Sequence, residues 1–189
     1  MNSTENILKH IHAHNNEHSK LPPVENWNPE FCGNMNMQIK ANGEWWHEGT
    51  PIGRKKLFKL FSTILKKEEE QYFLVTPVEK IGIQVEWQPF VIIDFEIIDI
   101  DGKKIFQFVD NCDNLIQLNA EPQLKLSPFQ NERLPIVKVR RNLFASFSRS
   151  CYYRLIESAE LKKENDQTII KVNSNGIDFV LGEVDENSL

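Results

Sequence analysis

The order of hydrophobic and polar residues along the chain predicts amphipathic helices and many short strands. Between residues 57 and 65 the hydrophobic residues recur at the spacing of one helix face. Strands are predicted where β-branched and aromatic residues gather, at residues 72–75, 81–85, 90–100, 104–109 and 168–172. Asp101-Gly102 and Asn175-Gly176 predict tight turns between strands. Because helices and strands do not alternate in βαβ order, the pattern predicts the α+β class.

A nine-residue motif occurs twice, at residues 54–62 and 140–148. Its copies read Arg-Lys-Lys-Leu-Phe-Lys-Leu-Phe-Ser and Arg-Arg-Asn-Leu-Phe-Ala-Ser-Phe-Ser. The identical positions lie 86 residues apart: Arg54, Leu57, Phe58, Phe61 and Ser62 recur as Arg140, Leu143, Phe144, Phe147 and Ser148. Such a repeat suggests two related structural units. We predict that each copy begins a helix, and that Ser148 caps a further helical segment that carries Cys151 and Leu155.

These observations predict two small β-rich, roll-like units, each with an amphipathic helix and related by the internal repeat. The expected boundaries are an N-terminal appendage at residues 1–20, a first α+β unit at 21–90 and a second at 91–189. Pro22-Pro23 imposes an extended entry into the first unit. A chain of 189 residues suits one domain or two small ones.

The charges are unevenly distributed along the chain. The net charge of −5 argues against general nucleic-acid binding, which usually needs a basic domain. Yet residues 50–67 and 133–156 together hold 12 of the 22 Lys and Arg residues and none of the 27 Asp and Glu residues. Both stretches contain the repeated motif, so the basic half of each copy is the first candidate for function.

The composition excludes several classes of protein. No hydrophobic run approaches the roughly 20 residues of a membrane helix, and the first residues lack the hydrophobic region of a secretory signal. Cys32, Cys112 and Cys151 are far apart and odd in number, so neither a disulfide framework nor a zinc motif is predicted. We therefore expect a cytoplasmic protein without contact to a membrane.

The predicted ligand-binding residues lie at the two basic motifs. They are Arg54, Lys55, Arg140 and Arg141, with Trp46 and Tyr153 as added aromatic surface. A helix N-terminus offers unpaired N–H groups and a positive dipole end, to which Arg and Lys add donors for an anion. The alternative needs no ligand: the hydrophobic half of the motif packs in a core, and the basic half pairs with acids such as Glu68, at about 0–1 kcal/mol per pair.

No catalytic residue, metal site or cofactor is predicted. Four histidines near the start lack acidic or cysteine partners at a defined spacing: His10, His12, His14 and His18. The close carboxylates alternate with hydrophobic residues as on a solvated strand: Asp94, Glu96, Asp99 and Asp101. Gly49 and Gly53 are separated by three residues instead of the four of a phosphate-binding P-loop.

Several segments resemble DUF1285, an uncharacterised bacterial family of unknown function. They are residues 22–29 (Pro-Pro-Val-Glu-Asn-Trp-Asn-Pro), 31–33 (Phe-Cys-Gly), 49–54 (Gly-Thr-Pro-Ile-Gly-Arg), 72–79 (Tyr-Phe-Leu-Val-Thr-Pro-Val-Glu) and the helix with Tyr152-Tyr153. The resemblance spans residues 21–184. It implies two small β-rich units with repeated structural motifs and a role in signalling, and it carries no catalytic residue.

Together these patterns predict a non-enzymatic binding or sensing module that recognises a small anionic ligand or an acidic protein surface. Two alternatives stay open. An enzyme acting on a small acidic metabolite would show an enclosed cleft holding His47 or Asp94 with another polar group. A structural protein or homodimer would show a large hydrophobic patch at a two-fold contact.

Overall fold

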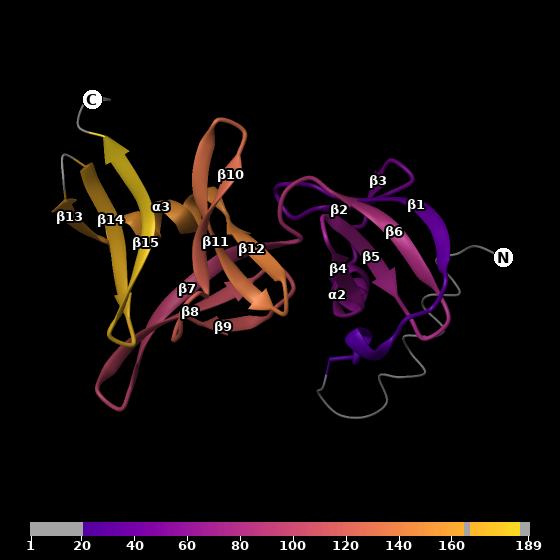
Figure 1. Ribbon diagram of the computed structural model, residues 1–189, viewed down its shortest axis with the longest axis horizontal. Coiled ribbons are helices and arrows are strands. Elements are labelled where there is room, and N and C mark those ends of the chain that lie inside the picture. The colour runs from indigo at the N-terminus through magenta and orange to yellow at the C-terminus, as the bar shows by residue number, and fades with distance from the viewer. Residues whose placement is uncertain (1–20, 165–166, 186–189) are drawn as a thin grey trace. The chain divides into compact units, whose positions relative to one another are not determined.

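The computed structural model describes residues 21–164 and 167–185 and divides the chain into two compact units (Figure 1). Unit 1 comprises Met1–Trp87 and unit 2 comprises Gln88–Leu189. The histidines at positions 10 to 18 lie outside the described residues. Each unit is described below by itself. Within the described residues no helix is long and hydrophobic enough to cross a membrane.

Unit 1 combines one six-stranded sheet with a short 3₁₀ turn and one helix. Its elements are η1 (Val24–Asn26), β1 (Phe31–Ile39), β2 (Trp45–His47), β3 (Thr50–Pro51), α2 (Lys55–Thr63), β4 (Leu65–Glu68), β5 (Gln71–Val75) and β6 (Lys80–Val85). The strand order is β3-β2-β1-β6-β5-β4. All neighbours are antiparallel except the central pair β1–β6, which is parallel. The sheet is therefore two three-stranded meanders joined by their first and last strands.

Unit 2 contains a second six-stranded sheet with the same plan. Its strands are β7 (Phe90–Ile100), β8 (Lys103–Asp110), β9 (Leu115–Gln117), β10 (Leu124–Phe129), β11 (Glu132–Arg140) and β12 (Leu143–Phe147). The order is β10-β11-β12-β7-β8-β9, and again only the central pair, β12–β7, is parallel. The predicted architecture of two related β-rich units is therefore present as two similar sheets.

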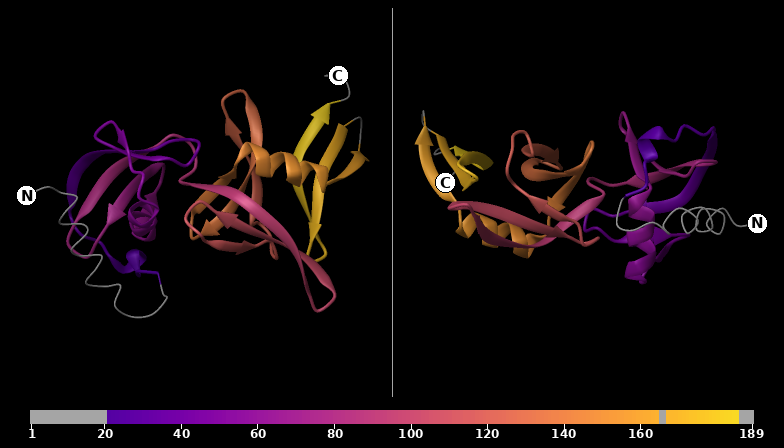
Figure 2. Two further views of the ribbon diagram at one scale, coloured as in Figure 1. Left: turned by 180° about the vertical axis from the view of Figure 1, so that it is seen from behind. Right: turned by 90° about the horizontal axis from the view of Figure 1, so that it is seen from below.

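A helix links the second sheet to a smaller one in unit 2 (Figure 2). Helix α3 (Arg149–Glu157) is followed by β13 (Glu160–Glu164), β14 (Gln167–Ser174) and β15 (Ile177–Asp185), which form a three-stranded antiparallel sheet. Ser148 is the N-cap of α3, and its Oγ accepts a hydrogen bond from the N–H of Cys151 at 3.3 Å. The predicted cap is thus confirmed.

The two predicted tight turns join strands of unit 2. Asp101 and Gly102 have φ of +54° and +77° between β7 and β8, and Asn175 and Gly176 have the same values between β14 and β15. Positive φ at both central residues defines the turn whose twist matches antiparallel strands, and Asp-Gly and Asn-Gly adopt it most readily. Local chemistry therefore fixes where these hairpins reverse.

The prediction that the repeated motif begins a helix in both copies is wrong. Residues 54–62 form the N-cap and most of α2, whereas residues 140–148 form the end of β11, a turn and the strand β12. In the first copy the helical spacing continues to Ile64 and Leu65, both fully buried. In the second copy Arg141 adopts a left-handed turn with φ +48°, and Ala145 pairs with Val137 and Phe90 on either side. Pairing with two neighbours outweighs the local helical pattern.

The helix α2 is attached to unit 1 through its C-terminal half. Phe61 is fully buried, and its ring stacks on that of Trp45 with centroids 6.3 Å apart and an interplanar angle of 24°. Leu57, Phe58 and Leu60 are only half-buried. The stacked pair therefore holds the helix against the sheet, while its first turns keep part of their hydrophobic surface accessible.

We predict that Phe61→Ala lowers the free energy of unfolding of unit 1 by about 3–5 kcal/mol, since it removes a fully buried ring and leaves a cavity. All four tryptophans, at positions 27, 45, 46 and 87, belong to unit 1, so guanidinium unfolding followed by tryptophan fluorescence reports this unit. Phe58→Ala on the same helix is the control and should cost clearly less. Equal losses in the two variants would contradict the assignment of Phe61 as the anchor.

Candidate functional site

The first basic motif forms the exposed start of α2. Arg54 is the N-cap in extended conformation, and no side chain caps the helix. Arg54, Lys55 and Lys56 are exposed, as is Lys59 one turn later, and the first turn contains no acidic residue. Cations next to the positive end of a helix dipole are unfavourable by about 0.3–1 kcal/mol each. A bound anion would interact favourably with the same end of the dipole and with the cations, so this end of α2 suits an acidic group.

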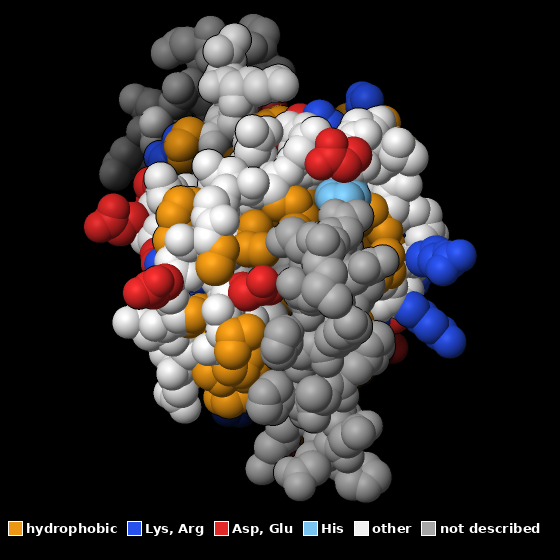
Figure 3. Space-filling model, turned by 90° about the vertical axis from the view of Figure 1, so that its right-hand side faces the viewer, with side chains coloured by type: hydrophobic (Ala, Val, Ile, Leu, Met, Phe, Trp, Pro, Cys, Tyr) orange, Lys and Arg blue, Asp and Glu red, His pale blue; other side chains and the backbone are white. Residues whose placement is uncertain are grey.

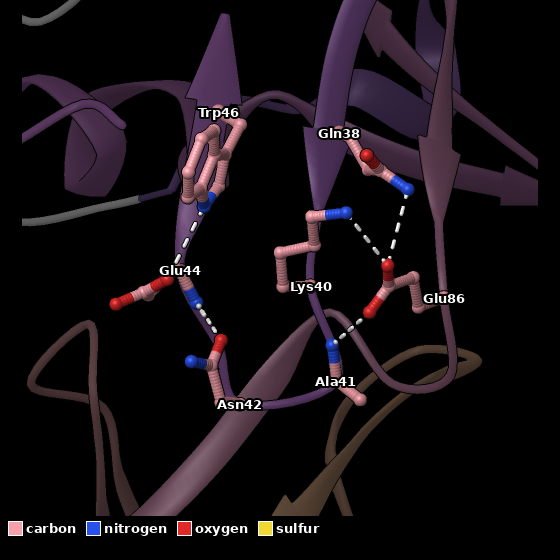
Figure 4. A network of polar contacts seen from close by, with 7 residues as sticks. All are labelled: Gln38, Lys40, Ala41, Asn42, Glu44, Trp46 and Glu86. Carbon is pink, nitrogen blue, oxygen red and sulfur yellow. Dashed lines mark hydrogen bonds and ion pairs between the residues drawn. The ribbon is translucent and has the colours of Figure 1, made fainter. Parts of the chain in front are cut away.

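Trp46 lies on β2 within a network of polar contacts (Figure 4). Its Nε1 donates a hydrogen bond to Glu44 Oε2 at 3.2 Å, and Lys40 Nζ lies 6.0 Å from the centre of its ring. Lys40 Nζ also donates to Glu86 Oε1 at 2.9 Å. Trp46 pairs with Pro51 of β3. The structure thus connects this predicted residue with the β1–β2 hairpin, and its part in binding stays a prediction.

Glu86 holds the hairpin to the end of β6 (Figure 4). Its carboxylate accepts hydrogen bonds from Gln38 Nε2 at 3.2 Å, Lys40 Nζ at 2.9 Å and the Ala41 N–H at 2.9 Å. The contacts with Lys40 and the Ala41 N–H lower the pKa of Glu86 below its ordinary value of 4.5. The ionised carboxylate therefore joins the end of β6 to three residues at the end of β1 and in the turn that follows it.

The second basic motif lies in the turn between β11 and β12. The Arg140 guanidinium is half-buried, 4.8 Å from the centre of the Phe90 ring, and Nη1 donates to Asn114 Oδ1 at 3.4 Å. Burial lowers the pKa of Arg140, whereas the charge of Asp110 opposes this change. The prediction that Arg140 and Arg141 stand at a helix start is therefore wrong, and their role as ligand contacts stays a prediction.

Asp110 forms the acidic centre of the same cluster. Its fully buried carboxylate accepts hydrogen bonds from the Cys112 N–H at 2.8 Å, the Asn114 N–H at 2.9 Å and Asn114 Nδ2 at 2.6 Å. Burial raises the pKa of Asp110, while these hydrogen bonds and the charge of Arg140 lower it. The positive charge of Arg140 thus acts on the buried carboxyl group of Asp110. The spacing of these residues in the sequence does not indicate this relation.

Tyr153 lies on the exposed face of α3 beside two arginines. It is 52% exposed, and its hydroxyl accepts from Arg149 Nε at 3.4 Å and Nη2 at 3.3 Å. Arg154 donates hydrogen bonds to Asp94 Oδ1 at 2.8 Å and to the Phe95 carbonyl at 3.2 Å. The hydrogen bond to Asp94 lowers the pKa of that carboxyl group. Arg149 was not among the residues predicted from the sequence, although its i, i+4 spacing to Tyr153 on a helix indicates such a pair.

The six predicted residues thus fall into two groups of three. Trp46, Arg54 and Lys55 belong to unit 1, and Arg140, Arg141 and Tyr153 belong to unit 2. Three cavities of about 400, 400 and 440 Å³ are lined by none of the six, nor by His47 or Asp94. Among residues 21–164 and 167–185 no three His, Cys, Asp or Glu side chains gather in a way that could hold a metal ion.

Comparison with known proteins places the chain in a family. Residues 22–88 match the family model "Domain of unknown function (DUF1285), N-terminal domain", and residues 89–181 match "Protein of unknown function (DUF1285), C-terminal domain". The chain therefore belongs to the DUF1285 family, as its motifs predicted. No curated protein matches it.

Two solved structures of the same family are similar to this chain. The crystal structure of a DUF1285 family protein from Silicibacter pomeroyi DSS-3 is 34% identical, with a TM-score of 0.79, and the match covers 97% of this chain and 98% of that one. A second one, from Shewanella baltica OS155, is 31% identical with a TM-score of 0.54, covering 65% of this chain and 91% of that one. These likenesses support the fold and assign no activity.

We predict that Glu86→Gln lowers the thermal midpoint of unit 1 near neutral pH and has little effect in acid. A carboxyl group whose folded pKa is depressed stabilises the protein above its unfolded pKa and loses that effect as the pH falls through the folded pKa. Thermal unfolding followed by tryptophan fluorescence at about pH 7 and about pH 3 measures the difference. The exposed Glu30→Gln is the control, and a difference that persists in acid would contradict the role of the charge.

We predict that Arg140→Ala destabilises unit 2 by about 1–3 kcal/mol, because it removes a positive charge that favours the ionised form of the buried Asp110 carboxyl group. Hydrogen exchange across residues 88–157 measures the loss where it is expected. Lys138→Ala, an exposed change on the same strand, should stay within about 0.5 kcal/mol. An Arg140→Ala variant as stable as the Lys138→Ala variant would show that Arg140 is not a structural counter-charge.

Proposed function

We propose that this protein is a non-enzymatic binding module of the bacterial cytoplasm that recognises an acidic protein surface through the start of α2, in a signalling role. The observation that carries the proposal is the coincidence of an uncapped helix N-terminus with four exposed cations: Arg54, Lys55, Lys56 and Lys59. Such an arrangement weakens the isolated helix and strengthens its attraction for an anion.

The two ends of the basic stretch differ in what surrounds them. Lys66 and Lys67, after the helix, pair with Glu68 and Glu70 at 3.1 Å each. Arg54 and Lys56, at the start, have no acidic partner among the described residues. Neutralisation by nearby acids, the alternative explanation of the basic stretch, therefore accounts for Lys66 and Lys67 and not for Arg54 and Lys56.

Hydrophobic surface next to the cations favours a protein over a small anion. Leu57, Phe58 and Leu60 lie half-buried on the same two turns of α2. Protein interfaces combine a hydrophobic centre with a polar rim, whereas small ligands are usually enclosed in cavities. Because neither Arg54 nor Lys55 lines any of the three cavities, an acidic protein surface fits this helix better.

We predict that replacing all four cations with Gln weakens binding of an acidic peptide at least about tenfold, since each exposed contact contributes a few tenths of a kcal/mol or more. The probe is a fluorescein-labelled oligoglutamate peptide, and anisotropy titration at low ionic strength measures its affinity. The matched control replaces Lys103, Lys104, Lys125 and Lys138 with Gln, which changes the net charge equally. The control should keep the affinity within about twofold.

Stability provides an independent measurement on the same variants. Removal of cations from the positive end of α2 should leave the thermal midpoint unchanged or raise it, because the dipole interaction improves. Equal weakening in both quadruple variants would show that only net charge attracts the peptide, which contradicts the proposal. Binding of inorganic pyrophosphate without binding of oligoglutamate would also contradict it and would indicate a small-anion site instead.

A further inference from the structure

The parallel pair β1–β6 is irregular at the start of β1. Phe31 pairs with Lys80, Asn34 with Gly82 and Gln38 with Gln84. Strand β1 therefore advances three residues, and then four, while β6 advances two each time. Such bulges redirect side chains, and glycine inside a strand often marks a place where another group approaches closely.

Gly82 creates the free space at this irregular point. A Cβ atom at Gly82 would lie 2.1 Å from Asn34 Oδ1, so the Asn34 carboxamide occupies the room that the missing side chain leaves. The backbone of Gly82 has no unusual φ, so a side chain at this position is limited by space and not by backbone conformation. Gly82 therefore fixes where the Asn34 amide can lie.

A cavity of about 440 Å³ opens at this place, within the range of about 300–1,000 Å³ that small-molecule sites occupy. Its lining includes Phe31, Asn34, Gln71, Phe73, Gly82 and Gln84. Phe31 is 55% exposed, and its ring stands edge-on to that of Phe73 at 6.1 Å. In Figure 1 the strand β1 lies beside β6 in unit 1, and the face drawn in Figure 3 shows hydrophobic side chains gathered among polar ones.

Three amide side chains line the cavity together with the exposed Phe31 ring. Asn34, Gln71 and Gln84 are exposed, and none makes a side-chain hydrogen bond with another described residue. Each carboxamide presents two donor hydrogens and an acceptor oxygen. Gln38, which pairs with Gln84 in the ladder, differs from these three because its side chain donates a hydrogen bond to Glu86.

The charged groups near the cavity are already paired with one another. Glu70 pairs with Lys67 at 3.1 Å, and Glu68 pairs with both Lys66 and Lys80. Lys80 Nζ also lies 4.5 Å from the centre of the Phe73 ring. A charged ligand would have to compete with these pairs, whereas a neutral one would not.

We infer that this cavity binds a neutral polyhydroxylated ligand, namely a sugar ring of a short oligosaccharide. A sugar ring has a C–H face that packs on an aromatic side chain such as Phe31, and hydroxyl groups that both donate and accept. The amides of Asn34, Gln71 and Gln84 supply both functions. The inference does not depend on the proposed function, because the cations of α2 do not line this cavity.

The experiment titrates the ¹⁵N-labelled full-length chain with maltotriose, cellotriose and triacetylchitotriose, followed by amide chemical shifts. We expect at least one trisaccharide to give saturable shifts confined to residues 31–34, 70–73 and 82–85. Phe31→Ala should weaken binding about tenfold, since it removes the stacking surface. Gly82→Ala should weaken it several-fold by displacing the Asn34 amide, which is the end of a flexible side chain and can move without disturbing the fold.

Val78→Ala is the matched control, because Val78 is also 55% exposed in unit 1 and does not line the cavity. Absence of saturable shifts with all three sugars would overturn the inference, as would binding that neither Phe31→Ala nor Gly82→Ala affects. Saturable shifts at the same residues with adenosine or triglycine, but with no sugar, would overturn the ligand class. If Phe31→Ala changes the far-UV circular dichroism, the double variant Gln71→Leu/Gln84→Leu, at two exposed positions, replaces it and should also weaken binding.

Discussion

The fold of this protein depends on one kind of contact, a parallel pair of strands at the centre of each six-stranded sheet. All other neighbours in these sheets are antiparallel strands of local meanders. The pairs β1–β6 and β7–β12 instead join strands about 50 residues apart and turn two marginal three-stranded meanders into one sheet. Closing such long loops costs conformational entropy, which the buried strands Phe90–Ile92 and Ile81–Ile83 offset by packing.

Local elements could be read from the sequence because their causes are local. The hydrophobic stripe of α2, the Ser148 cap and the turns at Asp101-Gly102 and Asn175-Gly176 each depend on residues a few positions apart. The helix predicted for the second copy of the repeated motif is wrong because Leu-Phe-x-x-Phe is compatible with a helix and with a strand. Its second copy is a strand because β11 and β7 lie on either side of it, and nothing within the nine residues specifies those neighbours.

The same distinction separates the parts of the candidate site that sequence could and could not predict. The exposed cations of α2 follow from a stretch without acids and from helical spacing. Arg140 belongs to the same charge pattern, yet the structure surrounds it with Phe90, Asp110 and Asn114, which come from other strands of the sheet. The cavity at Gly82 carried no sequence signal, because it arises from the register between β1 and β6.

The two sheets also differ at one equivalent place, the connection between their meanders. In unit 1 this connection runs from β3 to β4 and contains α2, whereas in unit 2 residues 118–123 join β9 to β10 without a helix. The connection can therefore gain or lose a whole helix while the strand order stays the same. A recognition element placed there can diversify during evolution without rebuilding the scaffold, so family members with different partners should differ most in this segment.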